Sequence, residues 1–181
     1  MNVISIREKK AYLAYEATLY KHDLVNQQDT RTFVIPTVVP NPDPNAYTGI
    51  DDTAFYQKHL FALVPGKQSH VYAFNTETET FVNYPLPFHP LEIAVIADLL
   101  FASINRYEET RTGSGGVYYI DSIAHSDIAV FDLKTEKIVG TVRDVFDSAT
   151  LEIKSNVLPE LIKIARNALN LPSSQRFCTI V

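Results

Sequence analysis

Acidic and basic residues suited to metal-assisted hydrolysis lie close together in the last third of the chain. Asp132 and Asp144 follow β-rich segments, and Glu152-Ile153-Lys154 lies in a further candidate strand. Because alternate residues of a strand share a face, Glu152 and Lys154 are expected to point the same way. Carboxylates of this kind can hold Mg²⁺ while a lysine assists the attacking water. These residues therefore form one candidate catalytic set.

This arrangement resembles the core of metal-dependent nucleases of the PD-(D/E)xK type. In that family an acidic residue on one strand is followed by Glu-x-Lys on the next. The resemblance implies a Mg²⁺-dependent nuclease with Asp132 or Asp144, Glu152 and Lys154 in the active site. The Pro-Asp pair typical of the family is absent at these positions. The alternative interpretation is a charged, solvent-facing sheet surface, so the nuclease is kept as an alternative function.

Two other short motifs lack the context that their chemistry requires. The glycine-rich run Gly113–Gly116 leads into "VYYID", a strand, whereas a phosphate loop opens a helix and carries a Lys-Ser/Thr pair. His125-Ser126-Asp127 contains the residue types of a catalytic triad, but neighbours on a strand point to opposite faces. We interpret these motifs as a linker and a strand entry, and we expect no metal and no cofactor.

Charge and cysteine content exclude several classes of protein. The 181-residue chain has a net charge of −5, so no nucleic-acid partner is expected. Its one cysteine, Cys178, allows no intrachain disulfide. The longest apolar run, "LEIAVIADLLFASI", contains Glu92 and Asp98 and is too short to span a membrane. The composition predicts a soluble, cytoplasmic protein without a membrane partner.

Residues 172–181 are expected to form a flexible tail. The tail ends in Cys178-Thr179-Ile180-Val181, which resembles both a loose prenylation signal and the C-terminal ligand of a PDZ domain. Both motifs are short enough to arise by chance. The sequence does not decide whether this terminus is modified or recognised.

Aromatic and proline-rich segments suggest a different activity. The chain has 10 tyrosines and no tryptophan, and tyrosine is favoured at protein interfaces because its ring buries area while its hydroxyl stays hydrated. Residues 31–49 form a proline-rich arm that could wrap a neighbouring protein. The interface candidates are Tyr12, Tyr15, Tyr20, Pro40, Pro42, Pro44 and Tyr47. The alternative is that these are ordinary core and surface residues.

The spacing of apolar residues predicts three main helices. Ser5 to Glu8 reads as a capping box that opens a helix over Ser5–Val25, with a strand as the alternative for "AYLAYEATLY". Leu91–Tyr107 is apolar on nearly every side, which is typical of a buried helix. Asn156–Asn170 has an apolar face and a proline in its first turn. A shorter helix is predicted through "TAFYQKHLFAL".

Two segments echo each other, "VYAFNTETETFV" from Val71 and "IAVFDLKTEKIV" from Ile128. Asn75 and Asp132 stand at the same place before a turn, where their side chains can accept backbone N–H groups. Such hairpins resemble those of β-propeller blades, but two copies separated by a predicted core helix cannot form a propeller. We therefore interpret them as two hairpins rather than blades.

Together these patterns predict one α+β domain over residues 1–171. An antiparallel sheet with two β-hairpins would pack on the buried central helix, covered by the N- and C-terminal helices. Because no catalytic set is complete, the predicted function is a non-enzymatic protein-interaction or assembly component. An immunity-type or virion/assembly-type protein fits this description. It would bind itself or a protein partner through the tyrosines and the proline-rich arm.

Overall fold

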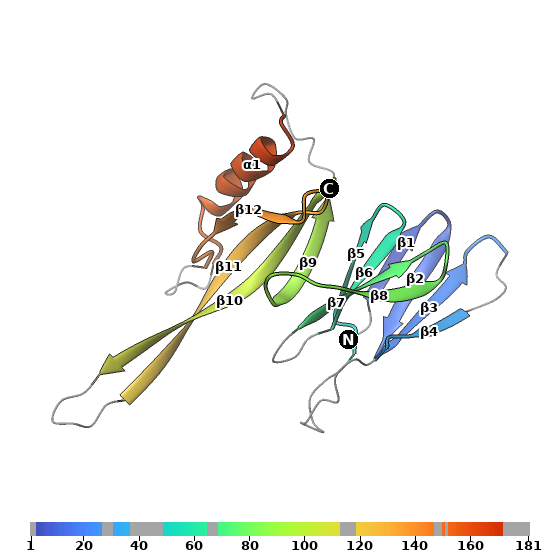
Figure 1. The fold of residues 1–181 in the computed structure, drawn as a ribbon, viewed down its shortest axis with the longest axis horizontal. Coiled ribbons are helices and arrows are strands. Elements are labelled where there is room, and N and C mark those ends of the chain that lie inside the picture. The colour runs from blue at the N-terminus through green and yellow to red at the C-terminus, as the bar shows by residue number, and fades with distance from the viewer. Residues whose placement is uncertain are drawn as a thin grey trace. The chain divides into compact units, whose positions relative to one another are not determined.

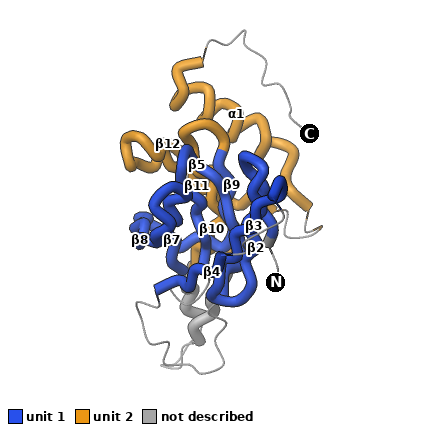
Figure 2. Tube along the Cα trace, turned by 90° about the vertical axis from the view of Figure 1, so that its right-hand side faces the viewer, with its two compact units in different colours: residues 1–95 blue, residues 96–181 orange. Residues whose placement is uncertain are grey.

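The computed structural model describes residues 3–26, 31–36, 49–64, 69–112, 119–146, 150 and 152–171. Over these residues the chain forms three four-stranded antiparallel sheets and one helix (Figure 1). The chain divides into two compact units, Met1–Val95 and Ile96–Val181 (Figure 2). The unit boundary falls within β9.

In each sheet, strands that are consecutive in the sequence are neighbours in space, so each sheet is a simple meander. Sheet A consists of β1 (Val3–Arg7), β2 (Lys10–Tyr15), β3 (Thr18–Asp23) and β4 (Arg31–Val34). Sheet B consists of β5 (Asp52–Tyr56), β6 (His59–Val64), β7 (His70–Asn75) and β8 (Thr80–Tyr84). Sheet C consists of β9 (Pro90–Ile96), β10 (Leu99–Thr112), β11 (Tyr119–Asp132) and β12 (Lys137–Val142), and helix α1 spans Val157–Ala168.

The predicted α+β fold, with N- and C-terminal helices covering a sheet, is wrong. The Ser5–Val25 segment forms β1–β3 instead of a helix. The Ser5 hydroxyl hydrogen-bonds the Thr53 hydroxyl of β5 at 2.7 Å, so it does not cap a helix. Glu8 and Lys9 form the β1–β2 turn, with φ angles of 50° and 62°. The pairing with a neighbouring sheet, which local sequence does not reveal, decided this conformation.

The predicted buried helix Leu91–Tyr107 is also wrong: the segment forms β9, a turn at Ala97 (φ 54°) and the first part of β10. Leu99 and Leu100 are both buried although they point to opposite faces of sheet C. A strand buried on both faces is continuously apolar, like a buried helix. The short helix predicted through "TAFYQKHLFAL" is β5 and β6. The predicted C-terminal helix is confirmed as α1.

The three sheets are copies of one motif, which shows most clearly at the end of each third strand. Asp23, Asn75 and Asp132 occupy this position. The Oδ1 atom of Asp23 accepts the N–H groups of Val25 and Asn26, at 2.8 and 3.2 Å. Asn75 accepts the equivalent pair at 2.9 and 3.1 Å, and Asp132 at 2.8 and 3.2 Å. The turns predicted at Asn75 and Asp132 are thus confirmed.

A second hydrogen bond repeats with the first. The residue after each of these positions donates its N–H to a carbonyl in the first hairpin turn of the same sheet. The pairs are Leu24 to Lys9, Thr76 to Lys58 and Leu133 to Asp98, each at 2.9 Å. The echoed hairpins β7–β8 and β11–β12 are therefore the second halves of repeated four-stranded meanders, the strand arrangement of a propeller blade. Both segments form hairpins as predicted, but strands β9 and β10 replace the core helix that was predicted between them, so the reason given against a repeat was wrong.

In the first unit, sheets A and B pack face to face. Their shared core contains Tyr12, Ala14 and Leu19 from sheet A and Leu60, Ala62, Tyr72 and Phe74 from sheet B. Aromatic contacts cross this core: Tyr12 of β2 contacts Phe55 of β5 edge-on at 5.4 Å between ring centroids, and Phe33 of β4 contacts Phe74 of β7 at 4.8 Å. This arrangement buries the inner face of sheet A completely at its centre.

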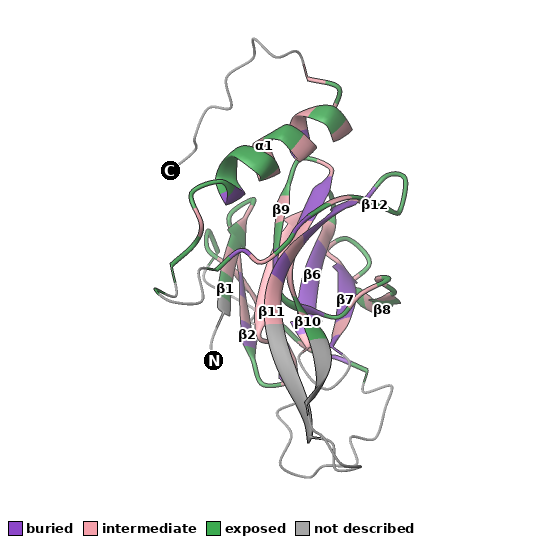
Figure 3. Cartoon of the chain, turned by 90° about the vertical axis from the view of Figure 1, so that its left-hand side faces the viewer, coloured by how far each residue is buried: buried purple, intermediate pink, exposed green. Residues whose placement is uncertain are grey.

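In the second unit, α1 covers one face of sheet C. Leu99 and Val130 pack on Ala165, while Val142 and Val145 pack on Val157. The outward side of the helix is exposed (Figure 3). The helix approaches β12 closely at Gly140, where a Cβ atom would lie 2.7–2.9 Å from three side-chain atoms of Ile164. Only glycine leaves room for this contact.

We predict that Gly140→Ala lowers the free energy of unfolding by about 1–3 kcal/mol, because the added methyl group overlaps the branched Ile164 side chain. Urea denaturation measures this loss. The control is the same substitution made in an Ile164→Ala background, where the overlap is absent and the cost should largely disappear. An equal cost in both backgrounds would contradict the close approach.

The equivalent residues Glu79 and Glu136 adopt left-handed backbone angles, with φ of 59° and 55°. Glycine adopts these angles without steric cost. Glu136 is exposed and has no ion pair to another described residue. We predict that Glu136→Gly raises the free energy of unfolding by up to about 1 kcal/mol, whereas Glu136→Ala, which keeps the strain, gives no gain. Thermal denaturation of the two variants tests the turn, and stabilisation by alanine would disprove this explanation.

Candidate functional site

The face of sheet A that lies opposite to sheet B is apolar; we call it the outer face. Strand pairing places three cross-strand rows on it: Ile4–Leu13–Tyr20–Thr32, Ile6–Ala11–His22 and Tyr15–Thr18–Val34. Among the described residues of β1–β4, none of the Asp, Glu, Lys or Arg side chains lies on this face. The charged residues of these strands, such as Arg7 and Lys21, belong to the alternate rows that face sheet B.

Several large apolar side chains of the outer face are accessible to solvent. The exposed fractions are 65% for Ile4, 66% for Ile6, 48% for Tyr15 and 68% for Val34. An antiparallel sheet with one face in water normally carries polar side chains on that face. A contiguous apolar patch rimmed by polar residues is typical of an interaction site.

The structure separates the tyrosines that sequence analysis grouped as interface candidates. Tyr12 is 3% exposed and lies in the core between sheets A and B, where burial raises the pKa of its hydroxyl. Tyr15 and Tyr20 lie on the outer face. Pro40, Pro42, Pro44 and Tyr47 fall outside the described residues.

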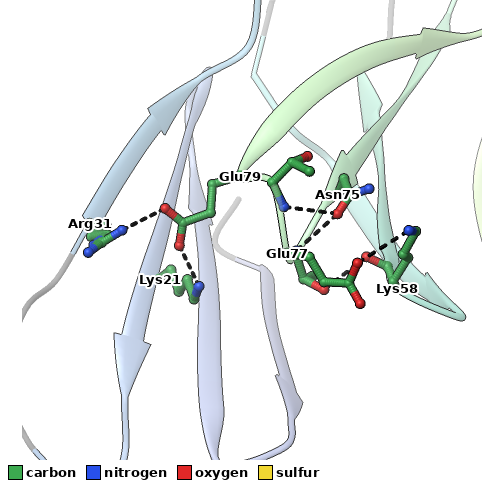
Figure 4. Close-up of polar contacts among 8 residues, drawn as sticks. Lys21, Arg31, Lys58, Asn75, Glu77 and Glu79 are labelled. Carbon is green, nitrogen blue, oxygen red and sulfur yellow. Dashed lines mark hydrogen bonds and ion pairs between the residues drawn. The ribbon is translucent and has the colours of Figure 1, made fainter.

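A partly exposed ion-pair cluster joins sheet A to sheet B (Figure 4). The Glu79 carboxylate, in the β7–β8 turn, accepts hydrogen bonds from Lys21 Nζ at 2.6 Å and from Arg31 Nη1 at 2.7 Å. These partners lie on β3 and β4, so one side chain of sheet B binds two strands of sheet A. The hydrogen bond from Lys21, followed by that from Arg31, lowers the pKa of Glu79. These hydrogen bonds therefore help to hold sheet A, and with it the outer face, in place against sheet B.

A second polar cluster lies in the other unit. Arg106 of β10 donates to Asp127 at 3.0 Å and to Asp144 at 3.1 Å, and His125 Nδ1 lies 2.6 Å from Asp144. The backbone N–H of Asp144 donates to the buried Asp127 carboxylate at 2.9 Å. His125 and Asp127 come together because alternate residues of β11 share a face.

This cluster fixes an irregular backbone segment. Asp144 has a φ of 51°, and the hydrogen bond from His125 is the main cause of its lowered pKa. Next to it, Val145 N–H donates to Ser126 and Lys154 N–H donates to Val145. The network joins β10, β11 and the chain that leads to α1. A structural role, which is to hold these segments together, is enough to explain its geometry.

The structure brings together part of the proposed nuclease set. Lys154 is near enough to Asp144 to lower its pKa. Asp132 lies at the opposite end of β12, because it pairs with Lys137 at the start of that strand whereas Asp144 follows its end. Glu152 is exposed. In the part of the chain described, no group of three or more His, Cys, Asp or Glu side chains could hold a metal ion.

Comparison with known protein families and with curated proteins gives no match for this chain. Within the described ranges, no helix is long and apolar enough to cross a membrane. The candidate site therefore depends on its own geometry, and the outer face of sheet A is the feature that calls for a function.

The outer face could not be predicted while Ser5–Val25 was interpreted as a helix. The available signal was the repeated pattern of the first hairpin: "EKKAYLAY", "QKHLFALV" and "ADLLFASI" each place two turn residues before an apolar strand. Aligned in this way, the first segment is a strand like the other two. Strand alternation then places Tyr15 opposite to Tyr12.

We predict that Glu79→Gln lowers the free energy of unfolding by about 1 kcal/mol at neutral pH, because both ion pairs are lost. Since the pKa of folded Glu79 is below that of the unfolded chain, its stabilisation is present above the unfolded value. It disappears as the pH falls through the folded value. Urea midpoints of the wild type and Glu79→Gln should therefore converge in acid.

Glu136→Gln is the matched control, because Glu136 occupies the same turn position in sheet C. It should leave the urea midpoint almost unchanged at every pH. A difference between wild type and Glu79→Gln that persisted below the folded pKa of Glu79 would show that the ion pairs are not its cause.

Proposed function

We propose that this chain is a non-enzymatic protein-interaction component that binds a protein surface through the outer face of sheet A. Tyr15 and Tyr20 supply the aromatic contacts, and Ile4, Ile6 and Val34 supply the exposed apolar area around them. The observation that carries the proposal is the solvent exposure of this mainly apolar sheet face, which has no Asp, Glu, Lys or Arg among the described residues of its strands.

The composition of the outer face supports a protein as the ligand. Charged residues are depleted from the centres of protein interfaces, whereas tyrosine is enriched there. The face is the open surface of a four-stranded sheet. A small molecule instead favours a concave site with a few converging polar groups.

The support beneath the face also favours binding without rearrangement. The inner rows of sheet A are buried in the core that it shares with sheet B. The ion pairs of Glu79 with Lys21 and Arg31 also join the two sheets. Surfaces held on a packed scaffold change little on association. The proline-rich arm of the sequence hypothesis, which includes Pro40, Pro42 and Pro44, stays a prediction.

Site-specific photo-crosslinking tests the proposal. The amino acid p-benzoylphenylalanine is placed at Tyr15 in one variant and at Phe146 in another, and each full chain is expressed in its native cells. Both residues are aromatic and similarly exposed, at 48% and 46%, but Phe146 belongs to the second unit. Irradiation should join position 15 to a defined protein and leave position 146 unreacted.

The proposal fails if position 15 gives no protein adduct. It also fails if positions 15 and 146 give the same set of adducts, because such a result would reflect general exposure rather than a binding site.

A further inference from the structure

We infer that the occupant of the outer face is a second copy of this chain, bound face to face about a two-fold axis. This inference rests on the proposed function, because it names the partner of the same surface. Three observations support it: the charge of the face, the helix that already covers one face of sheet C, and the size of the contact.

The first observation is the charge of the face. In a two-fold contact, residues close to the axis meet their own copies, so a charged residue there would meet a like charge. The outer face contains none of the Asp, Glu, Lys and Arg side chains of the described sheet A strands. A face built from Ile4, Ile6, Tyr15, Tyr20 and Val34 is therefore compatible with itself.

The second observation concerns sheet C, the last of the three repeated sheets, and the helix that covers it. Blade-like sheets can stack head to tail, with the first sheet of one copy on the last sheet of the next. In this chain α1 already covers one face of sheet C through Val157, Leu161 and Ala165. The face of sheet C that α1 covers is therefore not available to the outer face of another copy, which favours the pairing of two outer faces.

The third observation is the size of the face. The strands β1 to β4 contain 5, 6, 6 and 4 residues, and at about 3.4 Å per residue and about 4.8 Å between strands they give a face of roughly 340 Å². Two such faces would bury roughly 700 Å² of projected area in total, which is less than a stable interface buries and is in the range of weak, transient contacts. The expected complex is therefore a weak dimer with a micromolar dissociation constant, which dissociates on dilution.

Analytical ultracentrifugation of the full chain from about 1 µM to about 500 µM tests this inference. The weight-average mass should rise with concentration from 20.4 kDa towards twice that value and then stop. Ile6→Lys should weaken the dimer by about 30-fold or more, because it places a charge in the apolar contact. Val34→Lys, on the far edge strand β4, should weaken it similarly.

Ile153→Lys is the matched control. Ile153 is 65% exposed, like Ile4 and Ile6, but it belongs to the second unit. This variant should leave the dissociation constant unchanged. Circular dichroism and urea midpoints verify that each variant folds, as expected for substitutions at exposed positions.

Several results would overturn the inference. A wild-type chain that keeps the mass of a monomer at the highest concentration would do so, as would growth beyond the dimer or equal weakening by Ile153→Lys and Ile6→Lys. The photo-crosslink at Tyr15 separates this failure from that of the proposed function. A monomeric chain whose position 15 crosslinks to a different protein retains the interface and loses only the second copy.

Discussion

The structure depends on one constraint, which is that its sheets are apolar on both faces and must be covered on both. Sheet A supplies one cover for sheet B through the core around Tyr12, Leu60 and Phe74. Helix α1 supplies one for sheet C through the contacts of Val157 and Ala165. Burying apolar surface stabilises a protein by about 25 cal/mol per Å². An apolar sheet face left in water therefore loses a substantial part of this free energy. Among the described residues, the outer face of sheet A is where large apolar side chains such as Ile4, Ile6 and Val34 stay exposed to solvent.

The repeated meander meets the constraint with a small set of local contacts. An Asp or Asn at the end of each third strand binds the turn that follows, and the next residue binds the first hairpin turn. In sheets B and C an ion pair also joins these two turns. The basic and the acidic residue have changed places between the two sheets. Lys58 pairs with Glu77 in sheet B, and Lys134 pairs with Asp98 in sheet C. The geometry is thus kept while the residues change, which explains why the repeat is hard to see in the sequence.

Part of the fold could be predicted from local chemistry. The side chains of Asn75 and Asp132 bind their own turns, and Pro159 with the apolar residues that follow marks α1, because these signals act over a few residues. The first copy of the turn, at Asp23, was overlooked because its strand had been assigned to a helix. In the candidate site, Tyr15 and Tyr20 were named from composition alone, whereas the isoleucines and Val34 beside them were not named at all.

The sequence by itself determined the turns at Asn75 and Asp132, the position of α1 and which segments are apolar. Only the tertiary structure decided which side each apolar residue faces. Tyr12 and Tyr15 share a face in a helix but point to opposite faces in a strand. Their roles, one in the core and one on the outer face, therefore depended on whether sheet B lies beside sheet A. That contact joins residues far apart in the chain, so no local pattern can show it.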